Sequence, residues 1–206
     1  MDRNFYELDD NLGMKGRWFL NGLYDSRGTE FDGEDFSLGR PIAVGPPLVI
    51  SLWNDDEVAE VQPPLVVTLR RAGASLDFTY ADGAMPVVTT KVADLLERIC
   101  GADIQRFPVM VEGTDDWHEI INVLPLLDCI DKDRSEVESW WTEKDERPDK
   151  LGDPMSVIKL VLDPDRIGEH HIFRIRGWNT YPFASGVLKA ALERTNVSGI
   201  TYCKDP

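Results

Sequence analysis

The spacing of apolar residues changes near Val87, and this change limits which folds the 206-residue chain can adopt. Before it, segments such as GRWFLNGLYDSRGTEFDG alternate apolar and polar residues between glycines, as short antiparallel strands do. The β-branched runs IAVGPPLVISLW and PPLVVTLRR predict two more strands. After it, apolar residues recur at i, i+3, i+4 and i+7, the stripe of an amphipathic helix: Val92, Leu95, Leu96 and Ile99. Thr90 is the expected N-cap of this helix and Gly101 its expected C-cap.

A similar unit closes the chain. Ser185 is placed to cap a helix whose apolar stripe is Leu188, Ala191 and Leu192. A turn over Asn196–Gly199 and a strand through Ile200 and Tyr202 follow. The first helix is likewise followed by an apparent strand, IQRFPVMVE, so the two units are candidates for a helix–turn–strand repeat. The predicted fold class is α+β: a mostly antiparallel sheet with a few packed helices.

Length and cysteine usage predict one domain in a reducing compartment. At about 150 residues per domain, residues 1–206 make a single domain, with a strand-rich lobe (1–84) and an α+β lobe (85–206) as a finer division. The start of the chain lacks the basic and apolar regions of a signal peptide, and no apolar run is long enough to cross a membrane. Three widely spaced cysteines indicate buried thiols rather than a disulfide framework. We therefore expect a cytoplasmic protein without a membrane partner.

A search for catalytic and metal-binding patterns yields no candidate site. In HEIIN, the position where a zinc protease helix has its second histidine, four residues after His118, is Asn122. His170 and His171 are adjacent, and in a strand they would point to opposite faces. Cys129 lies in an apolar run and is expected in the core. Phosphate-binding glycine loops and the serine nucleophile elbow are also missing, so we expect no catalytic residue, cofactor or metal.

The net charge of −15 indicates which partners the chain favours. Such a field repels nucleic acid and anionic membranes and speeds encounters with basic proteins. Solubility alone is the alternative explanation.

The stretch LPLLDCIDKDRSEVESWW combines acids with two tryptophans. Ser135 and Glu138 have the spacing of a capping box, which predicts a helix beginning there. Val137, Trp140 and Trp141 would then share one face of that helix. The remaining acids would face either solvent or a partner.

Five segments, taken in order, resemble a known family: PVVTTKVADLLER, IQRFPVMVEG, IINVLPLLDCIDKDRSEVE, VIKLVLDPDRIGEHHIFRIRGW and SGVLKAALERTNVSGITY. The succession is similar to the immunity-protein family numbered eleven of bacterial polymorphic toxin systems, from about Met85 to Tyr202. The resemblance implies a cytoplasmic protein that binds a cognate toxin domain and blocks it without catalysis. It also implies a toxin that is encoded nearby and is commonly a basic nuclease.

Partner-binding candidates are acids close to aromatic residues, since buried aromatic anchors hold complexes and charge complementarity selects them. They are Asp115, Asp116, Trp117, Asp131, Asp133, Glu136, Trp140 and Trp141. Two other hypotheses remain open: a carboxylate-based hydrolase or transferase, which would have a pocket where acids and a histidine converge, and an effector-binding adaptor of a secretion system.

Overall fold

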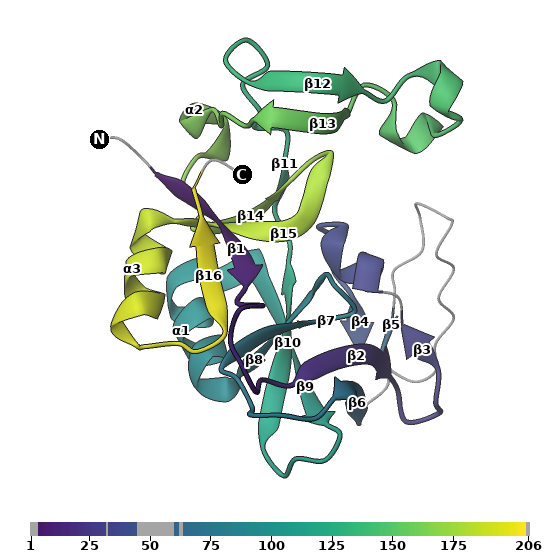
Figure 1. Cartoon of the computed structure of the whole chain (residues 1–206), viewed down its shortest axis with the longest axis vertical. Coiled ribbons are helices and arrows are strands. Elements are labelled where there is room, and N and C mark those ends of the chain that lie inside the picture. Colours follow the sequence, from purple (N-terminus) through teal and green to yellow (C-terminus); the bar gives the residue numbers. More distant parts are fainter. Residues whose placement is uncertain (1–3, 32, 45–59, 62–63, 205–206) are drawn as a thin grey trace.

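A computed structural model of the chain describes residues 4–31, 33–44, 60–61 and 64–204 (Figure 1). It contains two large sheets, two well-formed helices and a two-stranded arm at one end of the long axis. The predicted α+β class, mostly sheet with a few helices, is confirmed. Of the predicted strand in IAVGPPLVISLW, Ile42 and β4 (Ala43–Val44) are described, with β4 paired to β5 (Glu60–Val61), and residues 45–53 lie outside the described residues.

The larger sheet has seven strands. In spatial order they are β3 (Glu30–Phe31), β2 (Phe19–Tyr24), β6 (Leu65–Arg71), β9 (Ile104–Val111), β10 (Trp117–Val123), β8 (Met85–Thr89) and β7 (Phe78–Ala81). All these pairs are antiparallel except β6–β9. Successive strand residues alternate between faces, so Ile120 packs in one buried cluster and Ile121 in another.

The second sheet has five strands. In spatial order they are β11 (Leu126–Leu127), β14 (Ile172–Ile175), β15 (Trp178–Ser185), β1 (Phe5–Asp10) and β16 (Ile200–Cys203). The N-terminal strand β1 thus lies between two strands from the end of the chain. Each sheet combines strands from both sides of residue 84, and the division into lobes stays a prediction.

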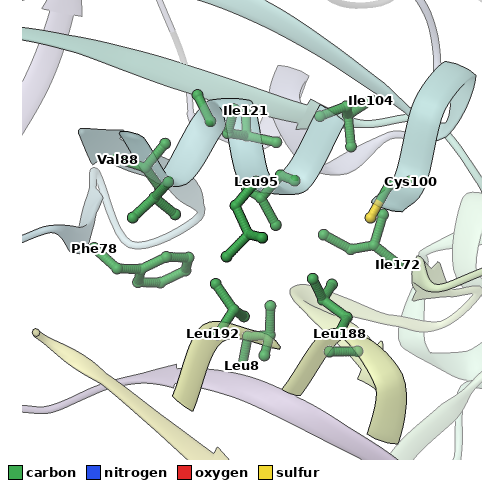
Figure 2. Packing of buried hydrophobic residues seen from close by; sticks show 14 of the residues in the cluster. Leu8, Phe78, Val88, Leu95, Cys100, Ile104, Ile121, Ile172, Leu188 and Leu192 are labelled. Carbon is green, nitrogen blue, oxygen red and sulfur yellow. The ribbon is translucent and has the colours of Figure 1, made fainter. Parts of the chain in front are cut away.

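Helices α1 (Thr90–Cys100) and α3 (Gly186–Arg194) pack between the two sheets (Figure 2). Their stripes meet there, with Leu95 of α1 pointing toward Leu188 and Leu192 of α3. Most of both predicted stripes is therefore buried, and Ile99 is partly buried.

The predicted helix ends are correct with one exception. Ser185 accepts the backbone N–H of Leu188 and caps α3, and Gly101 ends α1 with φ 54°. The N-cap of α1 is Thr89 instead of Thr90, because β8 runs directly into the helix and leaves Thr89 as the last extended residue. The turn and strand after each helix are present, with β9 inside the larger sheet and β16 at the edge of the smaller one. The repeat itself stays a prediction.

The remaining elements are short. They are η1 (Gly33–Ser37), η2 (Gly101–Asp103), η3 (Glu143–Asp145), η4 (Pro148–Lys150) and α2 (Pro164–Ile167). The arm is residues 131–159 and contains β12 (Glu136–Trp140) paired with β13 (Pro154–Lys159). Arg174 is fully buried and links the body together by donating to the carbonyl oxygens of Asn179, Thr180 and Ala84 at 2.7–3.1 Å. Burial lowers the pKa of its guanidinium to about 10.

Candidate recognition surfaces

The structure separates the predicted partner-binding residues into two groups. Asp115, Asp116 and Trp117 lie at the turn between β9 and β10, at the bottom of Figure 1. The other five lie in the arm at the opposite end of the long axis. The two groups are therefore separate candidate surfaces.

The first group belongs to an apolar surface on the seven-stranded sheet, here called the Trp117 face: Val66, Pro108, Met110 and Trp117. Trp117 is paired in register with Met110, and Met110 with Val66, so these side chains project from the same side of the sheet. Trp117 is 57% exposed and Met110 39%. Farther along the same side, Ile121 is buried with α1 in the core cluster that the helix completes. The end with Trp117 is not covered by the described part of the chain.

Sequence reasoning missed Pro108 and Met110. The signal was available in β9, where Phe107, Val109 and Val111 alternate with them and are buried on the other side. That alternation shows that Pro108 and Met110 face outward.

The turn beside Trp117 is held by its own hydrogen bonds. Thr114 donates its backbone N–H and its hydroxyl to the Val111 carbonyl oxygen, both at 3.1 Å. His118 is buried, packs against the Trp18 ring at a centroid distance of 5.2 Å, and places Nδ1 3.1 Å from the Asp116 carbonyl oxygen. Since that oxygen only accepts, Nδ1 carries the proton. His118 therefore positions the turn, and among the described residues no group of three metal-ligating side chains lies together.

The two carboxylates of this turn are available to a partner. Asp115 and Asp116 are both exposed. Within the described part of the chain, neither side chain has an ion pair or a hydrogen bond. They form an unpaired acidic rim beside the apolar face.

Three carboxylates gather around Arg106 where the Trp117 face meets α1 and form a second acidic element. Its guanidinium donates to Glu119 on β10 at 2.6 and 2.7 Å, and to Asp94 and Glu97 on α1 at 2.8 and 2.5 Å. The bonds to Glu119, followed by those from α1, raise the pKa of Arg106. One cation holds three carboxylates, so the boundary remains net negative.

The second group lies in strand β12 and directly beside it, and the predicted helix from Ser135 is wrong. The Ser135 hydroxyl bonds the backbone of Val161, donating to its oxygen at 3.1 Å and accepting its N–H at 2.9 Å. Glu138 accepts the hydroxyl of Ser156 on the paired strand at 2.8 Å. Both members of the expected capping box are therefore bonded to the returning chain, Glu138 to β13 and Ser135 to the backbone just after it. Pairing of β12 with β13 overrides a local helix signal worth about 1 kcal/mol.

Several side chains of the arm already have partners within the arm. Asp131 accepts two backbone N–H groups and lies 3.7 Å from the Arg134 guanidinium. Both tryptophans are half-buried, and each ring has a lysine Nζ 5.4 Å from its centre: Lys132 over Trp140 and Lys150 over Trp141. The carboxylates of Asp133 and Glu136 are exposed. The most exposed apolar side chain of the arm is Ile158, at 62%, which the sequence analysis did not single out.

A model of the Imm11 immunity protein family matches residues 24–204. The chain belongs to the Imm11 immunity protein family. The resemblance predicted from the sequence is thereby confirmed. No curated protein matches the chain. The match spans both the Trp117 face and the arm, so family membership alone does not favour either. Among the described helices of this Imm11 member, none has the length and apolarity needed to cross a membrane.

This Imm11 chain also has a cavity of about 700 Å³ where the start of β1 meets the residues before β14 and the start of α3. Glu169, His170, His171 and Ser185 line it. The histidines precede β14 instead of lying in a strand, and each has its own partner: Asp103 at 2.9 Å for His170 and the Ser185 hydroxyl at 2.8 Å for His171. Polar groups thus converge as the hydrolase hypothesis expects.

The chemistry of this cavity nonetheless favours a structural role for Ser185. Its oxygen accepts the Leu188 N–H as the cap of α3. The neighbouring Gly186 N–H, which would be the nearest oxyanion donor, is bonded to the Asn4 carbonyl oxygen at 2.9 Å. The pair formed by Ser185 and His171 therefore joins the start of α3 to the residue that precedes β14.

The thiols do not provide a nucleophile in the core of this Imm11 protein. Cys129 is fully buried, as predicted, and Cys100 is buried too. Burial raises the pKa of each thiol to about 12, which leaves almost no thiolate at neutral pH. Cys203 is exposed, so the expectation of three buried thiols is wrong for the residue on the edge strand β16.

Proposed function

We propose that this chain is an immunity protein that binds a cognate toxin domain one-to-one in the cytoplasm and neutralises it without catalysis. The Imm11 match over residues 24–204 carries this proposal. The toxin domain is proposed to be basic, of the nuclease class and encoded nearby. The net charge of −15 supports a basic partner, because complementary charge speeds association and selects against wrong partners.

The candidate contacts are acids and aromatic residues at the two ends of the molecule. They are Asp115, Asp116, Trp117, Asp131, Asp133, Glu136, Trp140 and Trp141. Buried aromatic anchors would supply affinity and the surrounding acids selectivity.

Titration calorimetry tests the proposal, with the C-terminal domain of the large protein encoded beside this chain as the probe. We expect one-to-one binding that weakens as salt rises, and loss of toxin activity in the same mixture at equal stoichiometry. Absence of binding at low and at high salt would reject the pairing. Binding with full toxin activity would instead identify an adaptor.

The cavity at Ser185 is the reason to test the hydrolase alternative as well. Ser185→Gly keeps a backbone compatible with the helix cap and removes the hydroxyl. We expect this variant to neutralise the toxin as the wild type does. Loss of protection with binding intact would favour catalysis.

A further inference from the structure

We infer that the toxin docks on the Trp117 face and not on the arm. This inference rests on the proposed function and deepens it. The occupant is a basic toxin domain with an apolar pocket that receives the Trp117 indole and with lysine or arginine side chains that pair with Asp115 and Asp116.

The first reason is how exposed each tryptophan ring is and whether a cation covers it. Trp117 is more than half exposed, and no ring or cation of the described residues lies against its indole. Trp140 and Trp141 are half-buried and have lysines over their rings. A partner that buried the arm tryptophans would have to displace these lysines, whereas Trp117 can enter a pocket directly.

The second reason is rigidity. Trp117 begins β10, which pairs with β9 along seven residues and with β8 on its other side. The turn before it is fixed by Thr114 and His118. The arm is a two-stranded sheet whose register shifts at three places, and two-stranded sheets are only marginally stable alone. Binding to the ordered face therefore loses less conformational entropy.

The third reason is the charge around the apolar centre. Asp115 and Asp116 can each pair with a cation of the toxin without breaking an ion pair of the described chain. In the arm, Asp133 and Glu136 are exposed as well, whereas Asp131 already bonds two backbone N–H groups and has Arg134 nearby. An apolar centre with an unpaired acidic rim has the anatomy of a hot spot for a basic partner.

A matched pair of alanine variants in the full-length chain tests this inference. Trp117→Ala and Ile158→Ala each remove one exposed apolar side chain, 57% and 62% exposed, so both variants should fold. Against the neighbour-encoded toxin domain, we expect Trp117→Ala to raise the Kd about 30-fold or more. Ile158→Ala should change the Kd less than about 2-fold, as is usual outside a hot spot.

A second pair tests the acidic rim. Asp115→Asn combined with Asp116→Asn should slow association about 3- to 10-fold at low salt, and this difference should disappear at high salt. The control, Glu143→Gln combined with Glu146→Gln, removes two exposed carboxylates from the arm and should leave the association rate within about 2-fold.

Hydrogen exchange of the wild-type complex gives a readout that needs no variant. We expect protection at residues 108–118 and none at 136–158. Protection confined to the arm, or a Kd raised by Ile158→Ala but not by Trp117→Ala, would overturn the inference while leaving the proposed function standing. If the wild-type chain neither binds nor inhibits the toxin domain, the proposed function fails first.

Discussion

The Trp117 face and the arm contain the same kinds of residues, yet their side chains have different partners. Both combine tryptophan with aspartate within a short stretch of sequence. On the face, Trp117, Asp115 and Asp116 make no side-chain contact of a polar or aromatic kind with the described chain. In the arm, lysines cover both tryptophans and Asp131 is bonded. Composition therefore identifies candidates for recognition, and the structure shows which of them are already satisfied.

The two regions also differ in what lies beneath them. Behind the Trp117 face, Phe107, Val109 and Ile120 pack in a large buried cluster. The arm reaches the cluster below it through Val157, which is only partly buried.

Removing the core beneath the face should be far more damaging than trimming the arm. Phe107 is buried edge-on to Phe36 at a centroid distance of 5.9 Å. Phe107→Ala should lower the free energy of unfolding by about 3–5 kcal/mol, because a buried ring leaves a cavity. Trp140→Ala in the half-buried arm should cost about 1 kcal/mol. Urea unfolding measures both, and equal losses would contradict the contrast.

Replacing an arginine should likewise cost more stability at the Trp117 face than in the arm. The Arg106 side chain is 21% exposed and neutralises Glu119, which is 8% exposed. Arg106→Gln should cost about 2–3 kcal/mol, mainly because Glu119 keeps a buried charge without its cation. Arg134 is 68% exposed and 3.7 Å from Asp131, so Arg134→Gln should cost less than about 0.5 kcal/mol. Thermal unfolding of the two variants side by side checks this ranking.

Glu7 offers a test of pH dependence, because no cation of the described residues pairs with it, in contrast to Glu119. Burial raises the pKa of the Glu7 carboxyl, only partly offset by the hydrogen bond from Trp178 Nε1 at 3.3 Å. The folded state thus holds this proton more strongly than the unfolded state, and stability falls as pH rises through the raised pKa.

Glu7→Gln removes that charge and should stabilise the protein at pH 8. The advantage should shrink as pH falls through the raised pKa and should be lost below about 4.3, the ordinary value of a glutamate, where both states of the wild type are protonated. Urea unfolding at pH 4 and pH 8 measures the difference. An advantage of equal size at both pH values would show that the burial of Glu7 is not its cause.

Uncovering the arm tryptophans should also have a small effect. Lys132→Ala and Lys150→Ala should each cost about 0.5 kcal/mol, the typical value of an exposed cation–π contact. Tryptophan fluorescence should change in both variants, while the Kd for the toxin domain stays the same. A tighter complex after either change would indicate that the arm, once uncovered, can dock as the Trp117 face does.

Local patterns in the sequence were sufficient for the helices α1 and α3. A residue's position on a helix face depends only on neighbours three or four places away, so stripes such as Leu188–Leu192 can be read directly. The strands β9 and β16 and the cap at Ser185 follow from signals of equally short range. Immunity-family membership was also readable from the order of segments along the chain.

The tertiary structure decided what depends on distant partners. Ser135 and Glu138 have the spacing of a capping box, but their partners are Val161 and Ser156, which lie 26 and 18 residues later in the chain. Strand β1 lies between β15 and β16, a pairing that no local pattern near the N-terminus could indicate. Strand pairing joins residues far apart in sequence and outweighs propensities worth about 1 kcal/mol or less.

The same reason applies to the candidate site. The sequence by itself identified acids and tryptophans and a chain whose charge favours a basic partner. Whether a tryptophan is covered by a lysine, or an aspartate is bonded to its own backbone, depends on where the folded chain places each potential partner. Only the folded arrangement therefore distinguishes the exposed Trp117 from the covered Trp140 and Trp141.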